Sequence, residues 1–429
     1  MPSTKKDTQT ERKTINRVCI LNPQGYVSFP PDLGKTDNGG QITFIFQLAK
    51  ALGKKGIKVD IITRKFDGLP EEEQVWEKVK IVRIAAGNEN FIPKEKLFEL
   101  IPEWTENFMV YLEKTRKKYD IIHSHYYDGG YGGILLAKML DIPHVNTPHS
   151  LGKLKKINMN PEEAPVQKLK PFYRYHVRIA VEQKIINTAD AITLLSETNR
   201  IQVLQHYIAD FEKLHVIYSG VDTDNFNTKK TEFDKKVKLQ ENSILTVSRI
   251  APAKGLDRLL DALHLIKNKV PFHYYLGGGV DESQQSGEEK AATQQIHELV
   301  KKHRLKDHVT FLGKVPQEGT LPAYYRAADI FVNAARFEMF GLTTQEAMAC
   351  GTVPIVSAVA GSREVIIDGL NGFIVDSHDR KALAETLLKL LSDPKLRKKV
   401  SENAAFTIQE HYAWDKIVDK YIALYKSLL

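Results

Sequence analysis

The sequence predicts an α/β protein built of two successive Rossmann-like, doubly wound domains. Its 429 residues exceed one ordinary hydrophobic core and suggest two domains of about 200 residues each. Short apolar, β-branched runs alternate with longer amphipathic stretches, which is typical of parallel strands joined by crossover helices. The same rhythm begins again after a polar stretch in the middle of the chain, so each half can bury a sheet of its own.

The first half contains seven runs short enough to be buried strands, several of them bounded by glycine or proline. They are Arg17–Leu21, Lys58–Thr63, Lys80–Ile84, Asp120–His123, His144–Thr147, Ala191–Leu195 and Leu214–Ile217. A helix is expected over Gln41–Leu52, because its apolar residues recur at helical spacing and share one face.

The second half repeats the pattern with six runs: Ile244–Val247, His273–Leu276, Val309–Leu312, Ile330–Asn333, Val353–Val356 and Gly372–Val375. The last segment, 411–429, is helical in its periodicity, and we expect it to close the second domain or to pack back on the first. The predicted organisation is a disordered polar tail (1–16), a first domain (17–227), a linker (228–240) and a second domain (241–410).

The cysteine content and the hydropathy of the chain argue against a disulfide-rich protein and against a membrane-spanning protein. The two cysteines, Cys19 and Cys350, are too far apart and too few to form a disulfide framework or a metal site, which suits a reducing cytoplasm. No apolar run approaches the ~18 residues that span a bilayer, and no signal peptide opens the chain. We therefore expect a cytoplasmic protein without stable membrane association.

The net charge of +8 and the pI of about 9.0 are compatible with nucleic acid, an anionic membrane or anionic small substrates as partners. The basic residues are spread along the chain, without an arginine-rich block interleaved with aromatic residues, so we expect no nucleic-acid partner. A solvated basic surface explains the charge equally well.

Because doubly wound sheets bind ligands beyond the carboxyl ends of their strands, the loops after each run are the candidate site. In the first half these loops carry Gly39-Gly40-Gln41 at a helix start, His125-Tyr126, and His149-Ser150-Leu151-Gly152 followed by Lys155. Arg174 and Arg178 lie one helical turn apart and, with Lys155, can form a phosphate clamp. A plain glycine turn, buried structural histidines and a charged helix face are the alternatives.

The second half carries a sharper pattern. Arg249 and Lys254 follow a strand and lead into a helix, which suits a diphosphate whose charge must be neutralised as it leaves. Glu338 lies in a later loop, and Glu346 follows one turn inside the next helix. Between them, the backbone amides of Phe340, Gly341 and Leu342 at the helix start can hold anionic oxygens.

At this point the chain resembles a known family. The Arg249-x4-Lys254 and Glu338-x7-Glu346 elements resemble those of retaining glycosyltransferases of the GT-B fold, in which two Rossmann-like domains face each other across a cleft. Gly39-Gly40-Gln41, His125-Tyr126 and the loop that begins at His149 resemble the sucrose-phosphate synthase branch, with mannosylfructose-phosphate synthase close by. The resemblance runs from about Arg17 to the C-terminal helix.

The resemblance implies metal-free, cofactor-free transfer of a hexose, with retention, from UDP-glucose or another nucleotide-sugar to a sugar phosphate such as fructose 6-phosphate. It implies catalytic roles for His149, Arg249, Lys254 and Glu338. It implies that the second domain binds the nucleotide-sugar at the cleft. It implies donor contacts from Gly40, Arg249, Lys254, Glu338, Phe340, Gly341, Leu342 and Glu346. It implies acceptor contacts in the first domain from Gly39, Gln41, Tyr126, Lys155, Arg174 and Arg178.

The chain departs from the family pattern at three places. Met339 replaces a usual proline, Ala360-Gly361-Ser362-Arg363-Glu364 replaces a common Gly-Gly pair, and Val177 replaces a residue that is often basic. No phosphatase-like extension follows, so a phosphorylated product would need a separate phosphatase.

Other readings remain open at this stage. One is a peripheral membrane glycosyltransferase with a lipid acceptor, and another is a nucleotide-sugar sensor without activity. A dinucleotide-binding Rossmann protein lacks its Gly-x-Gly-x-x-Gly fingerprint here. Asp222-Thr223-Asp224 resembles a metal site of another glycosyltransferase class, but its context favours an interdomain loop.

Overall fold

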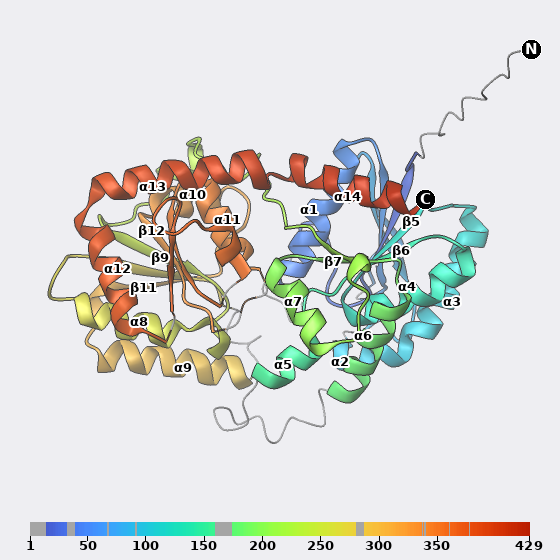
Figure 1. Ribbon diagram of the computed structural model, residues 1–429, viewed down its shortest axis with the longest axis horizontal. Helices are drawn as coiled ribbons and strands as arrows, with labels where there is room; N and C mark the ends of the chain where they lie inside the picture. The colour runs from blue at the N-terminus through green and yellow to red at the C-terminus, as the bar shows by residue number, and fades with distance from the viewer. Residues whose placement is uncertain are drawn as a thin grey trace, which may run out of the picture.

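The computed structural model of the protein describes residues 14–31, 39–66, 68–90, 92–158, 174–279, 287–336, 338, 340–359, 361–376 and 378–429. Two α/β domains lie side by side, and each has a central sheet with helices packed around it (Figure 1). The predicted fold class is therefore confirmed.

The first domain contains an eight-stranded sheet in the order β3-β4-β2-β1-β5-β6-β7-β8. All neighbours are parallel except β3 and β4. The strands are β1 (Arg17–Leu21), β2 (Lys58–Arg64), β3 (Glu72–Trp76), β4 (Val79–Ile84), β5 (Ile121–His125), β6 (His144–Thr147), β7 (Ala191–Leu194) and β8 (Leu214–Val216). The helices include α1 (Gly40–Lys54), α3 (Ile101–Thr115), α4 (Tyr126–Leu140), α5 (Gly152–Asn158), α6 (Tyr175–Thr188) and α7 (Glu197–His206).

All seven strands predicted for this half are present, but β3 was missed. Its residues are mostly polar and at most half-buried, because β3 is an antiparallel strand at the edge of the sheet. An edge strand of this kind lacks the continuous apolar run by which the buried parallel strands are found.

The second domain contains a six-stranded parallel sheet in the order β11-β10-β9-β12-β13-β14. Its strands are β9 (Ser243–Val247), β10 (His273–Gly277), β11 (Val309–Gly313), β12 (Ile330–Asn333), β13 (Val353–Ser357) and β14 (Phe373–Val375). Its helices are α8 (Leu256–Ile266), α9 (Gly287–Lys302), α10 (Thr320–Ala327), α11 (Leu342–Ala349), α12 (Arg380–Ser392) and α13 (Pro394–Thr407).

Two predicted boundaries need correction. Ile15 is buried in the first core and the Asn16 amide donates to Asp120 (2.7 Å), so these residues belong to the first domain rather than to the predicted tail. Residues 1–13 of that tail lie outside the described residues. Phe226 is buried in the core of the second domain, and Asp234, inside the predicted linker, bonds to Arg326 (2.8 Å). The chain therefore enters the second domain earlier, near Val221.

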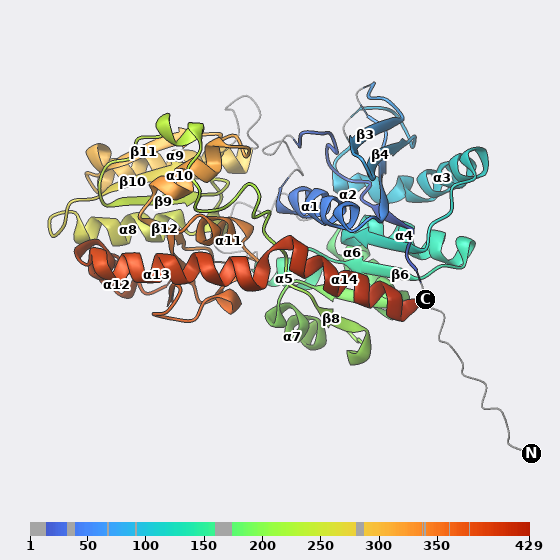
Figure 2. The ribbon, with the colours of Figure 1, turned by 90° about the horizontal axis from the view of Figure 1, so that it is seen from above.

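The last helix, α14 (Trp414–Leu428), leaves the second domain and packs on the first (Figures 1 and 2). Val221 and Ala413 form a β-bridge at the two points where the chain passes from one domain to the other. The Trp414 indole donates to Gln47 on α1 (2.7 Å), and Tyr421 and Tyr425 are fully buried in the first core. Helix α14 therefore ties the two domains together.

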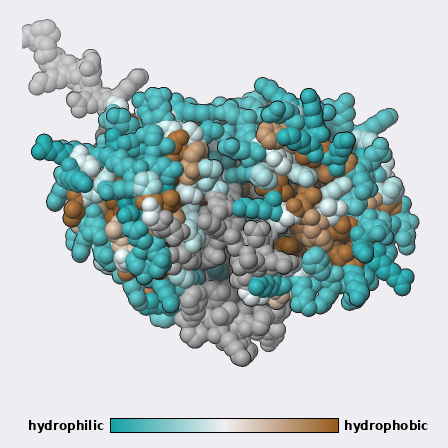
Figure 3. Space-filling model, turned by 180° about the vertical axis from the view of Figure 1, so that it is seen from behind, coloured by the Kyte–Doolittle hydropathy of each residue, from teal (hydrophilic) through white to brown (hydrophobic). Residues whose placement is uncertain are grey.

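Hydrophilic side chains dominate the face seen in Figure 3, where hydrophobic residues gather in separate groups. Ile208 and Phe406, the two most exposed large hydrophobic side chains of the described residues, lie on different domains. Within the described part of the chain, no helix is both long and apolar enough to cross a bilayer.

Candidate active site between the two domains

The two domains approach each other at the starts of α1 and α11. A Cβ atom on Gly40 would lie 3.5 Å from Leu342 Cδ1, so the first turns of these helices are in contact across the boundary. Helix N-termini carry unpaired N–H groups and partial positive charge, which favour anions. Gln41 follows in α1, and its amide is oriented by Asn22 (2.6 Å) and Gln24 (2.9 Å) after β1.

The cationic residues predicted to bind a diphosphate follow β9. The Arg249 side chain is exposed and makes no hydrogen bond or ion pair with the described residues. Lys254, at the end of a short 3₁₀ turn, is ion-paired with the Glu338 carboxylate, and both side chains are about one-fifth exposed (22% and 21%). Two predicted donor residues therefore meet, and the Lys254 ammonium, which carries three N–H donors, can bind a phosphate as well as Glu338.

An arginine that the sequence analysis missed holds these two loops together. Arg336, after β12, makes two hydrogen bonds to Asp257 at the start of α8 (2.7 and 2.5 Å) and donates to the Pro252 carbonyl (2.8 Å). Its backbone amide bonds to Ala253 (2.8 Å). The loop that carries Glu338 is thereby fixed beside the loop that carries Lys254.

The start of α11 depends on a glycine. Gly341 has φ = +83°, and a Cβ there would approach Asn333 Nδ2 and Ser362 Oγ to 3.1 Å. The Phe340 side chain is buried in the first core, where its ring lies 6.3 Å from that of Tyr218. Phe340 can therefore offer a ligand only its backbone, because its side chain is part of the contact between domains.

Glu346 lies on the buried side of α11. Its side chain is 4% exposed, and its one hydrogen bond within the described residues is a long one from the Tyr325 hydroxyl (3.4 Å). Burial, with a further contribution from Asp222, raises the pKa of Glu346 to about 7, although the Tyr325 hydrogen bond opposes the shift. A buried carboxylate with few partners is ready to accept hydrogen bonds from ligand hydroxyl groups.

This raised pKa predicts a stability effect. Glu346 holds its proton more tightly in the folded protein than in the unfolded chain. Its ionisation therefore lowers the free energy of unfolding as the pH rises above about 4.5, and the whole loss is present above about pH 7. Glu346→Gln, whose side chain cannot ionise, should therefore raise the free energy of unfolding by up to roughly 3 kcal/mol at about pH 8, because the pKa of Glu346 rises from 4.5 to about 7 on folding. Urea unfolding across this pH range measures it. The gain should vanish in acid and be absent in Glu385→Gln, an exposed residue on α12.

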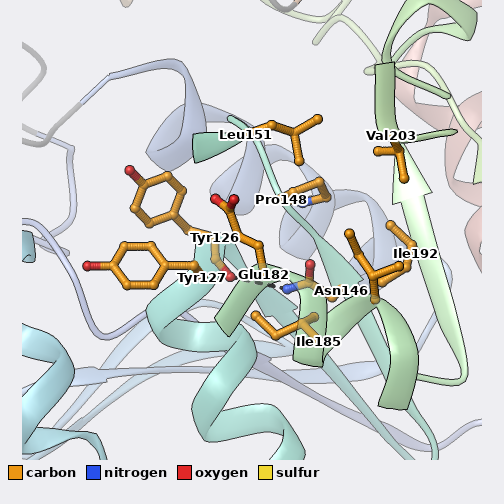
Figure 4. A pocket seen from close by; sticks show the side chains of 10 residues that line it. Tyr126, Tyr127, Asn146, Pro148, Leu151, Glu182, Ile185, Ile192 and Val203 are labelled. Atoms are coloured by element: carbon orange, nitrogen blue, oxygen red, sulfur yellow. Dashed lines mark hydrogen bonds between the residues drawn. The ribbon is translucent and has the colours of Figure 1, made fainter. Parts of the chain in front are cut away.

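Residues predicted to contact the acceptor surround the loop after β6. Arg178 is 5% exposed; it donates to Glu182 (2.7 Å) and to the Ser150 carbonyl (3.0 Å), and its guanidinium lies 4.7 Å from the Tyr126 ring. Glu182 also accepts the Gly152 amide (2.9 Å). Figure 4 shows the Glu182 carboxylate between Tyr126 and the turn carrying Pro148 and Leu151, beside a small cavity. Arg178 thus has a structural role already, and its charge is balanced by Glu182.

The other two residues predicted to contact the acceptor phosphate, Lys155 and Arg174, lie in different parts of the first domain. Lys155 lies in the last turn of α5, where its amide donates to the Leu151 carbonyl (2.9 Å), and its side chain is half-buried. Arg174 is ion-paired with Glu99 (2.6 Å) at the surface. The structure therefore places Lys155 and Arg178 beside one loop, whereas Arg174 is held at the surface by Glu99. Residues 159–173, between α5 and α6, lie outside the described residues.

Comparison with known proteins shows the family to which the chain belongs. The family model "Glycosyl transferases group 1" matches residues 227–406, and "Glycosyltransferase Family 4" matches residues 38–225. The chain is 33% identical over 428 residues to mannosylfructose-phosphate synthase of Agrobacterium fabrum, covering 97% of this chain and 92% of the relative. The chain belongs to the group 1 glycosyltransferases.

The chain is also similar to two other proteins. A D-inositol 3-phosphate glycosyltransferase of Xylanimonas cellulosilytica is 28% identical, with 91% of this chain and 92% of the relative covered. The solved structure of sucrose-phosphate synthase from Thermosynechococcus elongatus superposes with a TM-score of 0.83 at 29% identity, over 96% of this chain and 99% of that chain. The fold of this glycosyltransferase is therefore that of the GT-B enzymes.

The Asp222-Thr223-Asp224 segment of this glycosyltransferase binds lysines of the other domain. Asp222 pairs with Lys50 (2.7 Å) and Asp224 with Lys54 (2.5 Å), both on α1. Among the described residues, no three or more His, Cys, Asp or Glu side chains converge as metal ligands would. These aspartates take part in the domain contact.

Glu364 is a second residue that the sequence analysis missed. From the second domain, its carboxylate accepts the backbone amides of Glu197 and Thr198 (both 2.7 Å) at the start of α7, and the Tyr218 hydroxyl (3.1 Å). A carboxylate at a helix N-terminus is favoured by the helix dipole. Glu364 thus caps a helix of the opposite domain. Its only signal in the sequence is its place in the segment that departs from the family pattern.

Proposed function

We propose that the protein transfers glucose, with retention, from UDP-glucose to a sugar phosphate such as fructose 6-phosphate, giving sucrose 6-phosphate or a related disaccharide phosphate. The observation that carries the proposal is the contact of Gly40 with Leu342, which brings the Gly39-Gly40-Gln41 turn against the start of α11, just after Glu338 and its ion-pair partner Lys254. The similarity to mannosylfructose-phosphate and sucrose-phosphate synthases supports a sugar-phosphate acceptor.

The residues suggest how transfer proceeds. Arg249 and Lys254 hold the donor diphosphate and neutralise the charge that develops as the bond from the anomeric carbon to the phosphate oxygen breaks. Glu346 accepts hydrogen bonds from the ribose, while Glu338 and the amides at the start of α11 hold the sugar. The acceptor hydroxyl forms the new bond on the same face, and its proton passes to the departing phosphate oxygen, so nucleoside diphosphate and disaccharide phosphate are the products.

Substrate panels test this proposal. The protein is incubated with nucleotide-sugars that differ in base and hexose, each with fructose, fructose 6-phosphate or inositol phosphate, and released nucleotide and new product are measured. We expect product with UDP-glucose and fructose 6-phosphate. Product with inositol phosphate instead would assign the protein to the activity of its inositol-phosphate relatives. Product only with a lipid acceptor in vesicles, or no product with any acceptor, would overturn the proposal.

Activity should survive an excess of EDTA. Arg249 and Lys254 can neutralise a diphosphate without a divalent ion, and Asp222 and Asp224, the segment resembling a metal site, are paired with lysines. The measurement is the initial rate before and after chelation. Loss of the rate on chelation, with recovery on adding magnesium or manganese, would contradict a metal-free mechanism.

The product's phosphate has a further consequence for the cell. This proposed reaction leaves the acceptor phosphate in place, so release of the free disaccharide requires a separate phosphatase. We expect purified protein to accumulate phosphorylated disaccharide without releasing inorganic phosphate.

A further inference from the structure

Three histidine rings are stacked at the carboxyl ends of β5 and β6. The ring centroids of His123 and His125 are 4.5 Å apart, and those of His125 and His149 are 5.0 Å apart. Phe44 of α1 packs edge-on against His149 (5.1 Å). His123 and His125 are completely buried, whereas His149 is half-buried and has φ = +52°, an unusual value for a residue other than glycine.

The innermost ring is anchored at both nitrogens. His123 Nδ1 lies 2.6 Å from the Tyr425 hydroxyl of α14, and its Nε2 lies 2.8 Å from Thr147 Oγ1. Because Tyr425 is itself buried, the helix that returns from the second domain holds the base of the stack. The His123 ring therefore has little freedom to rotate.

The middle ring meets the outer one through a single hydrogen bond. His125 Nδ1 lies 2.8 Å from His149 Nε2. The other nitrogen of His125, Nε2, is buried and has no hydrogen-bond partner among the described residues. Burial lowers the pKa values of His123 and His149 to about 3 and lowers that of His125 well below its usual range, so all three rings are neutral and each carries one N–H.

One arrangement of protons suits these contacts. An N–H without an acceptor is costlier to bury than a ring nitrogen without a donor, so His125 should carry its proton on Nδ1 and leave Nε2 bare. His125 then donates to His149 Nε2. His149 must accordingly carry its own proton on Nδ1.

We propose that His125 is a positioning residue that fixes His149 as its Nδ1–H tautomer, so that His149 presents a hydrogen-bond donor to an oxygen of the transferred sugar. The proposal rests on the proposed function for the identity of the ligand, but the tautomer is a property of the free protein. The stack on His123 and Tyr425 sets the ring plane, and the His125 hydrogen bond sets which nitrogen is left for the substrate.

Nuclear magnetic resonance of the full chain with ¹⁵N-labelled histidine tests the tautomer directly. The His149 signals are assigned by their absence in His149→Gln. We expect the free wild-type protein near neutral pH to show a protonated Nδ1 and a bare Nε2 at His149. The opposite tautomer in the wild type would overturn the proposal, whether or not any variant folds and whether or not the transferase reaction is the one proposed.

A matched pair of variants tests the functional part. His125→Asn places an amide N–H close to the position of Nδ1, whereas His125→Phe keeps an aromatic ring but removes the donor. We expect His125→Phe to show mixed His149 tautomers and a kcat about 10- to 100-fold lower, with little change in the donor KM, and His125→Asn to recover most of both. Wild-type tautomer and kcat in His125→Phe would contradict the positioning role.

Discussion

Arg249→Ala and Lys254→Ala are each expected to lose about 30- to 1,000-fold in kcat, because removing a fixed cation from a leaving diphosphate costs about 2–4 kcal/mol. The fold should be retained, since Arg249 is exposed without a partner among the described residues and the Lys254–Glu338 pair is partly exposed. Steady-state rates with UDP-glucose, together with circular dichroism, measure both parts of the prediction.

The two variants should differ in a way that the Lys254–Glu338 pair explains. Lys254→Ala leaves the Glu338 carboxylate unpaired beside the incoming diphosphate, so its loss should be the larger one. Lys420→Ala, on the exposed face of α14, removes the same charge elsewhere and should keep the wild-type rate. Near-normal turnover by both Arg249→Ala and Lys254→Ala would move the donor site to another part of the molecule.

Fructose 6-phosphate is expected to exceed fructose in kcat/KM by at least ~100-fold, because each hydrogen bond to a charged group contributes roughly 1.5–3 kcal/mol and both Lys155 and Arg178 lie beside the loop after β6. Lys155→Ala should shrink this ratio. Lys156→Ala is the matched control, since Lys156 is the exposed neighbour in the same helix and carries the same charge. The ratio is measured from initial rates with each acceptor.

Arg178 is a poorer probe of the acceptor site than Lys155. Its guanidinium holds Glu182 and Ser150, so Arg178→Ala would disturb the loop after β6 as well as remove a charge. Arg174→Ala should have a small effect because Arg174 is paired with Glu99 at the surface. Equal use of fructose and fructose 6-phosphate would contradict the phosphate clamp. Release of nucleotide by hydrolysis alone would keep the donor site and reject the acceptor.

The sequence by itself determined the two-domain α/β architecture and the loops in which the candidate site lies. A parallel strand that is covered on both faces favours apolar, β-branched residues, so the parallel strands from Arg17–Leu21 to Phe373–Val375 are visible in the local sequence. Motifs such as Arg249-x4-Lys254 are equally local, because their residues lie in one loop. The polar edge strand Glu72–Trp76 carries no such signal and was missed.

Only the tertiary structure decided which distant residues meet. Glu364 caps α7 across 166 positions of sequence, Tyr425 anchors His123 across 302, and Arg336 joins Asp257 across 79. It also decided that Arg178 is held by Glu182 and that Phe226 belongs to the second core. Periodicity reports how much of a residue is buried, but a hydrogen bond between separate elements depends on where the packed sheets and helices place both partners.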